Sequence, residues 1–210
     1  MSIEIIHYEA NAGFGIIFPS KTFIIEEENQ ITVISPCDLS QEKIEQLKAS
    51  KKQIIFIAPN NFHNLYLKKM QQTFPKAEFF GPKRSAKQSG VELKKTTEYT
   101  SSILEMYPLN GNPGIGETCF YHKELKTLIV TDLFFNMKHK MNFATKMAMK
   151  CAGTYHKTAT SRAVKITTKD KAAFNTSLTA MGELDLESII PSHGGTLTRT
   201  EFKEFINHSI

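Results

Sequence analysis

The stretch of residues 54–67 constrains the fold more than any other part of this sequence. Ile54–Ile57 is a short β-branched and aromatic run, which is typical of a buried strand. Pro59 and two asparagines interrupt it, and a helical pattern begins at Leu65. A strand, a polar loop and a helix therefore follow one another, with His63 in the loop. Such a loop can hold ligand residues, because the strand is rigid and the loop side chains are able to converge.

The length of the chain predicts one domain. Its 210 residues suit one larger domain or two small ones. No linker, low-complexity tract or repeat divides the sequence, so we predict a single domain over residues 1–210 with two β-rich halves. No apolar run approaches the roughly 20 residues that span a membrane, and residues 1–5 lack the features of an export signal. We therefore expect a cytoplasmic protein without a membrane partner.

The cysteines support this expectation. Cys37, Cys119 and Cys151 are an odd number and are not arranged in CxxC pairs. This pattern predicts free, buried thiols in a reducing compartment, and a metal-ligand role for any of them is the less favoured alternative.

The net charge of +5 is concentrated in one segment. Between Leu133 and Ala172 the only acidic residue is Asp170, whereas the basic residues are Lys138, Lys140, Lys146, Lys150, Lys157, Arg162, Lys165, Lys169 and Lys171. A solvated basic face is the simpler interpretation, and attraction of an anionic ligand or nucleic acid is the alternative. Nucleic acid is the less favoured partner, because few aromatic residues for base stacking accompany these charges.

Short strands dominate the first third of the chain and return later. The early ones, Ile3–Tyr8, Gly15–Phe18, Thr22–Ile25 and Ile31–Ile34, are separated by turn residues that include Pro19, and they predict an antiparallel meander. The later ones are expected at Ala77–Phe80, Ser101–Tyr107, Thr118–His122, Thr127–Thr131 and Ser188–Pro191. Between them, Lys83–Thr97 is lysine-rich and is expected to be an exposed segment.

Helices are predicted from capping residues and apolar periodicity. Ser40 is a good N-cap for a helix that ends near Ala49, and Thr198 with Glu201 forms a capping box for a C-terminal helix. Residues 142–181 have a helical pattern in which Thr168 is a plausible cap. The four-residue spacing of Phe143, Met147 and Cys151 within it is typical of a stripe that packs in the core.

Three polar residues each follow the C-terminal end of a short apolar run. They are His63 after Ile54–Ile57, Asp132 after Leu128–Thr131, and His193 after Ile189–Pro191. Residues at the ends of adjacent strands converge in space, and ligand pockets commonly form there. Two imidazoles and one carboxylate would leave open positions on a divalent metal for water or substrate. Purely structural hydrogen bonds are the alternative for each residue.

The order of elements and these three loops resemble the metallo-β-lactamase fold, an α/β sandwich of four layers in which helices flank two mixed sheets. The resemblance covers most of the chain. Its later motifs fit well, since Asp132 ends the strand Leu128–Thr131 and His193 stands in Pro191-Ser192-His193-Gly194. The resemblance implies that Asp132 and His193 occupy metal-ligand positions of the family.

The earlier motifs depart from the family pattern. The signature H-x-H-x-D-H corresponds to Ala58-Pro59-Asn60-Asn61-Phe62-His63, which keeps only the last histidine and has Phe62 in place of the aspartate. The loop G-H-T-P-G corresponds to Asn110-Gly111-Asn112-Pro113-Gly114, which has a glycine in the ligand position. The resemblance therefore implies that a dinuclear zinc site is absent. Phe62 would make the remaining site drier, smaller or empty.

These positions lead to the hypothesis of a hydrolase-like protein that binds at most one metal through His63, Asp132 and His193. The ion would be zinc with an activated water, or iron held by two histidines and a carboxylate. By position, Asn60 would orient the water and the amide of Asn112 would bind an oxyanion, which makes both candidate catalytic residues. The substrate would be small and, given the basic segment, anionic.

Two other functions stay open. A metal-free pseudoenzyme would keep the pocket for a ligand or partner. Nucleic-acid processing is the weaker alternative, because the nucleases of this superfamily rely on the intact first motif. The remaining histidines, His7, His122, His139, His156 and His208, are expected to be surface or structural residues, with His139 or His156 as substitute ligands.

Overall fold

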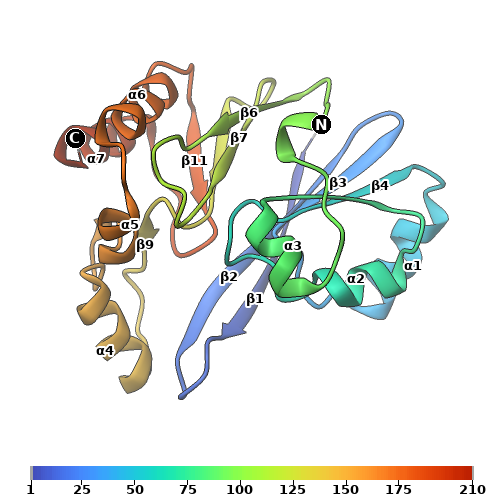
Figure 1. Cartoon of the computed structure of the whole chain (residues 1–210), viewed down its shortest axis with the longest axis horizontal. Coiled ribbons are helices and arrows are strands. Elements are labelled where there is room, and N and C mark those ends of the chain that lie inside the picture. Colours follow the sequence, from blue (N-terminus) through green and yellow to red (C-terminus); the bar gives the residue numbers. More distant parts are fainter. Residues whose placement is uncertain (1, 210) are drawn as a thin grey trace. The chain divides into compact units, whose positions relative to one another are not determined.

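The computed structural model describes residues 2–209, which form two mixed β-sheets with helices (Figure 1). Residues 1 and 210, the ends of the domain predicted over 1–210, lie outside the described part. The described chain falls into two compact units. The N-unit comprises residues 2–6 and 21–103, and the C-unit comprises residues 7–20 and 104–209. The prediction of a single domain stays a prediction.

The first sheet has the strand order β1–β2–β3–β4–β5. Its strands are β1 (Ile3–Asn11), β2 (Ile17–Glu26), β3 (Gln30–Ile34), β4 (Gln53–Ile57) and β5 (Glu78–Phe80). The pair β2–β3 is antiparallel, whereas β3–β4 and β4–β5 are parallel. The parallel pairs require crossover connections, which are provided by the helices α1 (Gln41–Ala49) and α2 (Leu67–Thr73).

The central strand β4 forms the middle of the N-unit core. Phe56 is fully buried and packs on the rings of Phe79 and Phe74, with centroids 5.2 and 5.3 Å away. A strand that is paired on both edges in parallel orientation and covered by helices reads as a continuous apolar run. The buried strand predicted at Ile54–Ile57 is therefore confirmed.

The second sheet lies entirely in the C-unit and has the order β11–β8–β7–β6. Its strands are β6 (Leu104–Pro108), β7 (Thr118–His122), β8 (Thr127–Val130) and β11 (Ser188–Pro191), and the pair β11–β8 is parallel. A small ribbon of β9 (Phe135–Asn136) and β10 (Thr158–Ala159) was not predicted. The helices of this unit are α4 (Phe143–Ala152), α5 (Arg162–Thr167), α6 (Lys171–Gly182) and α7 (Arg199–Ser209).

Helix caps predicted from the sequence are confirmed in two of three cases. The Ser40 hydroxyl accepts a hydrogen bond from the Lys43 amide, and Thr198 and Glu201 form the reciprocal bonds of a capping box. Thr168 is not the cap of α6. It ends α5, and the Asp170 carboxylate caps α6 instead by accepting a hydrogen bond from the Ala173 amide.

One prediction about the chain path is wrong. Pro19 does not break a strand, because β2 runs through it as one element. The register of β2 with β3 covers only Phe23–Glu26, so the missing proline N–H removes no hydrogen bond to β3. The segment Lys83–Thr97 is largely exposed, as predicted. It contains the helix α3 (Lys83–Ser89), which was not predicted, and the short 3-10 helix η1 (Thr96–Glu98) begins at its end.

The stripe of Phe143, Met147 and Cys151 does not pack in the core. In α4 these side chains face solvent, with Phe143 79% and Met147 43% exposed, whereas Thr145 and Met149 are buried. The prediction that these residues share one side of a helix is confirmed, but the prediction that this side is buried is wrong. Cys151 is consequently the exposed cysteine, while Cys37 and Cys119 are buried free thiols as predicted.

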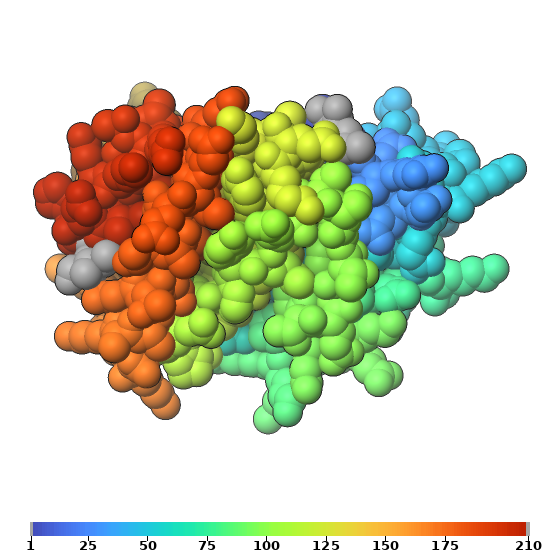
Figure 2. Space-filling view, turned by 90° about the horizontal axis from the view of Figure 1, so that it is seen from above, coloured from blue at the N-terminus to red at the C-terminus, as the bar shows by residue number. Residues whose placement is uncertain are grey.

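The basic segment is a solvated face over much of its length. Arg162, Lys165 and Lys169 are exposed, and Figure 2 shows the long side chains of this orange part of the chain reaching outward. Within residues 2–209 no helix is long and apolar enough to cross a membrane.

A buried carboxylate ties the end of the N-unit to its first sheet. Glu27 accepts hydrogen bonds from the Gln30 amide, the Ser101 hydroxyl, and the backbone N–H and hydroxyl of Ser102, at 2.6–2.8 Å. Burial alone would raise the pKa of Glu27, but the hydrogen bonds from Ser102, Gln30 and Ser101 outweigh it and lower the pKa below its ordinary value of 4.5. The ionised form therefore stabilises the fold.

We expect Glu27→Gln to lower the free energy of unfolding by about 1–3 kcal/mol at neutral pH, because a neutral amide oxygen accepts these bonds more weakly. Since the folded pKa lies below the unfolded one, the contribution is present above pH 4.5 and is lost as the pH falls through the folded value. Urea unfolding at neutral and acidic pH measures both effects. The exposed neighbour variant Glu28→Gln is the control, and an equal loss in both variants contradicts the assignment.

Candidate metal centre

The turn after β8 is held by a buried glutamate. Glu117 is 2% exposed and accepts hydrogen bonds from the backbone N–H groups of Thr131 at 2.6 Å and Asp132 at 2.9 Å, one on each carboxylate oxygen. Burial and, second, the charge of Asp132 raise the pKa of Glu117 to about 7 against the effect of these bonds. Glu117 therefore fixes the backbone from which the Asp132 side chain projects.

His193 follows β11 and faces Asp132. Its Nε2 lies 3.4 Å from Asp132 Oδ1, and both side chains are largely buried, with 8% and 13% exposed. On the other side of the ring, Nδ1 lies 3.1 Å from the Pro19 carbonyl oxygen and 3.4 Å from the Ser20 hydroxyl. The prediction that the loops after β8 and β11 bring two polar residues together is thus confirmed for this pair.

The orientation of His193 follows from these neighbours. A carbonyl oxygen only accepts hydrogen bonds, so the Pro19 contact requires the proton on Nδ1. In a neutral imidazole, Nε2 then carries the lone pair and points it at the Asp132 carboxylate. Two electron pairs 3.4 Å apart in a largely buried place are stabilised by a cation or proton between them. The donor set of this pair fits a divalent metal.

Aromatic packing fixes the imidazole plane. Phe135 in β9 stacks on the His193 ring, with centroids 5.0 Å apart and an interplanar angle of 9°, and Phe18 of β2 lies on it at 5.9 Å. A side chain held by two rings and a hydrogen bond loses little further freedom on binding a ligand. His193 is therefore preorganised.

Asn136 holds the loop that carries His193. Its backbone N–H donates to the His193 carbonyl at 3.0 Å, and its carbonyl accepts from the Gly195 N–H at 3.0 Å. Gly194 lies between them with φ +102°, and a Cβ atom there would be 2.1 Å from the Asn136 carbonyl oxygen. Only glycine fits this position.

In the N-unit, the loop after β4 is organised by Asn60. The buried Asn60 carboxamide oxygen accepts hydrogen bonds from the Phe62 and His63 backbone N–H groups at 2.7 and 3.0 Å. The His63 Nδ1 lies 2.6 Å from the hydroxyl of Ser35, the buried residue that follows β3. If Nδ1 donates to Ser35, Nε2 carries the lone pair of the neutral ring, which is the form that binds metals.

The positions of Phe62 and Asn112 differ from their expected roles. The Phe62 ring is 51% exposed beneath the Arg84 guanidinium, at 5.7 Å, so it does not fill a dry interior. Asn112 is buried, and its amide already donates to the Val164 carbonyl at 2.8 Å and to the Thr168 hydroxyl at 2.9 Å. Binding of an oxyanion by Asn112 and orientation of water by Asn60 stay predictions, and the former would require Asn112 to give up these bonds.

The residues that position the ligands were missed in the sequence. Glu117, Asn136 and Ser35 reach their partners through the fold, and no spacing along the chain marks them. The remaining histidines behave as expected of surface or structural residues. His139 and His156 are exposed, and the buried His122 accepts a hydrogen bond from the Leu125 N–H at 3.3 Å.

No protein-family model and no curated protein matches the sequence. Solved structures do match the fold. A metallo-β-lactamase of Pseudomonas aeruginosa in a mono-zinc form is 15% identical, with a TM-score of 0.64, and the match covers 99% of this chain and 92% of that one. A metallo-β-lactamase from Pontibacter korlensis is 11% identical, with a TM-score of 0.62 and coverage of 99% and 97%.

A further match has a different name. A fragment of a putative diflavin flavoprotein from Nostoc is 12% identical, with a TM-score of 0.59 and coverage of 98% of this chain and 92% of that one. At these identities the likeness shows the fold alone. The α/β fold with two mixed sheets that was predicted by resemblance is confirmed.

We expect Gly194→Ala to destabilise the protein by more than about 1 kcal/mol, because the new methyl group would meet the Asn136 carbonyl and φ +102° strains an alanine. Thermal unfolding measures the loss. The matched control is Gly90→Ala, since Gly90 also has a positive φ of 69° but a Cβ there meets nothing within 4 Å. Equal losses in the two variants would show that backbone strain alone is responsible.

Proposed function

We propose that this chain, which has the metallo-β-lactamase fold, is a hydrolase-like protein that binds one divalent metal through His63, Asp132 and His193. The observation that carries the proposal is the Asp132–His193 pair, in which the imidazole Nε2 lies 3.4 Å from a carboxylate oxygen. The fold supports the proposal, since one of the metallo-β-lactamases similar to this chain was solved in a mono-zinc form.

Zinc is the ion that this donor set favours, and iron in a two-histidine, one-carboxylate arrangement is the other choice. When bound, such an ion supplies a Lewis acid toward a carbonyl or phosphoryl oxygen. A third ligand is required for tight binding, and we assign this role to His63, whose Nδ1 is engaged by Ser35.

The chain's own residues prepare the ligands. Glu117 holds the backbone N–H of Asp132, so that its carboxylate keeps one direction. The Pro19 carbonyl keeps the His193 proton on Nδ1 and leaves Nε2 as the donor atom. This indirect support resembles the carboxylate–histidine pairs that tune metal sites in general. Glu117, Pro19 and Ser35 are therefore positioning residues.

The substrate we propose is small and anionic. Lys138 follows β9, which carries the Phe135 ring stacked on His193, and Lys157 precedes β10, which pairs with β9. Both lysines are exposed at this ribbon. Positive charge beside a candidate site raises the local concentration of anions and their rate of association.

A metal-free binding protein is the second candidate. One observation favours it, because Asn60 stands where the family signature has a histidine, and its carboxamide oxygen is used to hold the loop. In this case the pocket would bind a ligand or partner without turnover, and a proton would take the place of the cation beside His193.

We expect protein purified without chelator to contain close to one equivalent of zinc or iron by elemental analysis. His193→Ala and His63→Ala should each weaken metal binding by at least about 100-fold, because direct ligands matter more than their supporting partners. Added zinc, manganese or iron(II) should raise the melting temperature of the parent protein. At a metal concentration 100-fold above Kd, binding adds about 2.7 kcal/mol to the free energy of unfolding.

His7→Ala, which removes an exposed histidine of the C-unit, is the control and should bind metal like the parent. Asp132→Asn separates folding from binding, since it keeps the shape of the side chain and removes the charge. No bound metal and no shift in melting temperature with any of the three ions would leave the metal-free candidate. Metal binding that survives His63→Ala would restrict the site to the C-unit.

A further inference from the structure

Helix α4 is built with its apolar side outward. Phe143 and Met147 are 79% and 43% exposed, and Cys151 continues the same stripe four residues on. The inward side carries Thr145, whose hydroxyl accepts from the Ile17 N–H at 2.9 Å and lies 3.1 Å from the Ile17 carbonyl oxygen. A helix on a globular protein normally turns its apolar stripe to the core. In α4 the apolar stripe faces outward instead.

The tip of the β1–β2 hairpin adds a second exposed ring. Phe14 is fully exposed and lies between Gly13 and Gly15, and all three residues have positive φ values of 87°, 52° and 75°. A left-handed conformation is strained for a bulky residue such as phenylalanine. Hydrogen bonds between Ala12, Gly13 and Ile16 close the turn and hold this conformation.

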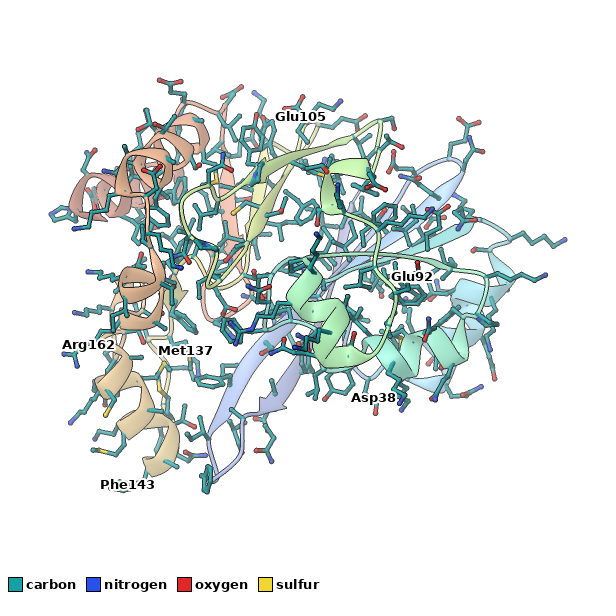
Figure 3. All side chains as sticks on the ribbon, viewed as in Figure 1. Asp38, Glu92, Glu105, Met137, Phe143 and Arg162 are labelled. Atoms are coloured by element: carbon teal, nitrogen blue, oxygen red, sulfur yellow. The ribbon has the colours of Figure 1, made fainter. Side chains whose placement is uncertain are left out.

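The two features belong to one surface of the C-unit. Asn142, the N-cap of α4, donates from its side-chain amide to the Gly15 carbonyl at 3.1 Å, and Thr145 binds the backbone of Ile17. Figure 1 shows the hairpin tip beside α4, and Figure 3 shows Phe143 at the outer end of that helix. We call Phe14, Phe143, Met147 and Cys151 the apolar rim.

In the sequence, α4 is flanked by basic residues and by no acidic ones. From Leu133 to Lys169 the sequence has no acidic residue. Lys146 and Lys150 lie over the Tyr155 ring at 5.7 and 5.4 Å, and Lys138 and Lys140 are exposed just before the helix. Exposed aromatic and methionine side chains flanked by lysines match the boundary between anionic headgroups and acyl chains.

We propose that the apolar rim docks this protein on the surface of an anionic phospholipid membrane. Phe14 and Phe143 enter the headgroup boundary, and the lysines of α4 bind the headgroup phosphates. Docking of a second copy of the chain on this surface is less favourable, because it would bring these lysines close to the same lysines of the other copy. Single-stranded nucleic acid would use the rings but gain little from Met147 and Cys151. We expected no membrane partner because the sequence lacks a membrane-spanning segment, but peripheral binding requires no such segment.

The experiment is flotation of the full chain with vesicles of phosphatidylcholine, with or without phosphatidylglycerol. We expect binding only with phosphatidylglycerol, and less of it as salt is added. The double variant Phe14→Ser/Phe143→Ser should bind at least about tenfold more weakly. Lys146→Gln and Lys150→Gln should each weaken binding about fivefold. Phe14, Phe143 and Lys150 are exposed and Lys146 is half-buried, so melting temperatures should stay close to that of the parent. Metal content provides an independent readout of the folded site.

Leu65→Ser and Lys68→Gln are matched controls, because each removes an exposed residue of the same kind from the N-unit. Absence of flotation, or flotation that the double phenylalanine variant does not reduce, overturns the proposal. Binding of a labelled single-stranded oligonucleotide in place of vesicles, lost in the same variant, assigns the rim to nucleic acid and also overturns it. A dimer that this variant abolishes assigns it to self-association with the same consequence.

Discussion

The hydrogen bond between His193 Nδ1 and the Pro19 carbonyl sets the orientation of the His193 ring in the C-unit. It fixes the proton on one nitrogen and so directs the lone pair of the other toward Asp132. Three parts of the chain contribute to this ring, since β2 brings Pro19, β9 brings Phe135, and the turn after β8 brings Asp132. A proton or cation between the two groups stabilises this arrangement, because a neutral imidazole Nε2 and a carboxylate are both acceptors.

Proline is suited to this position for the reason that makes it unusual in a strand. It has no N–H to offer a neighbouring strand, yet its carbonyl remains a full acceptor. Pro19 lies outside the register that β2 shares with β3, and its oxygen is directed to His193 instead. The residue that the sequence pattern treats as a strand break is therefore a residue that orients a candidate ligand.

Local rules found the elements and the ends of strands. Short apolar runs predicted β4, β7, β8 and β11, and the residues just beyond three of these strands are His63, Asp132 and His193. The supporting residues could not be found in this way, because Glu117 acts on a turn 14 residues away and Ser20 lies 173 residues from His193. Their significance depends on strand pairing, and a sequence pattern contains no information on which carbonyl will face which imidazole. The family resemblance predicted the fold. Because identity to the solved structures is low, proposals about the chemistry rest on these contacts.

The direction of α4 shows a further limit of periodicity. A stripe of apolar residues predicts that one side of a helix differs from the other, but it does not say which side is covered. Burying Phe143 would gain about 1.5–3 kcal/mol, whereas each hydrogen bond between Thr145 and the partly buried Ile17 backbone contributes about 0.5–1.5 kcal/mol. Thr145 satisfies both groups with one hydroxyl. The two hydrogen bonds at the hairpin are thus comparable in free energy with the apolar burial that they replace, and they leave the aromatic side of the helix facing outward.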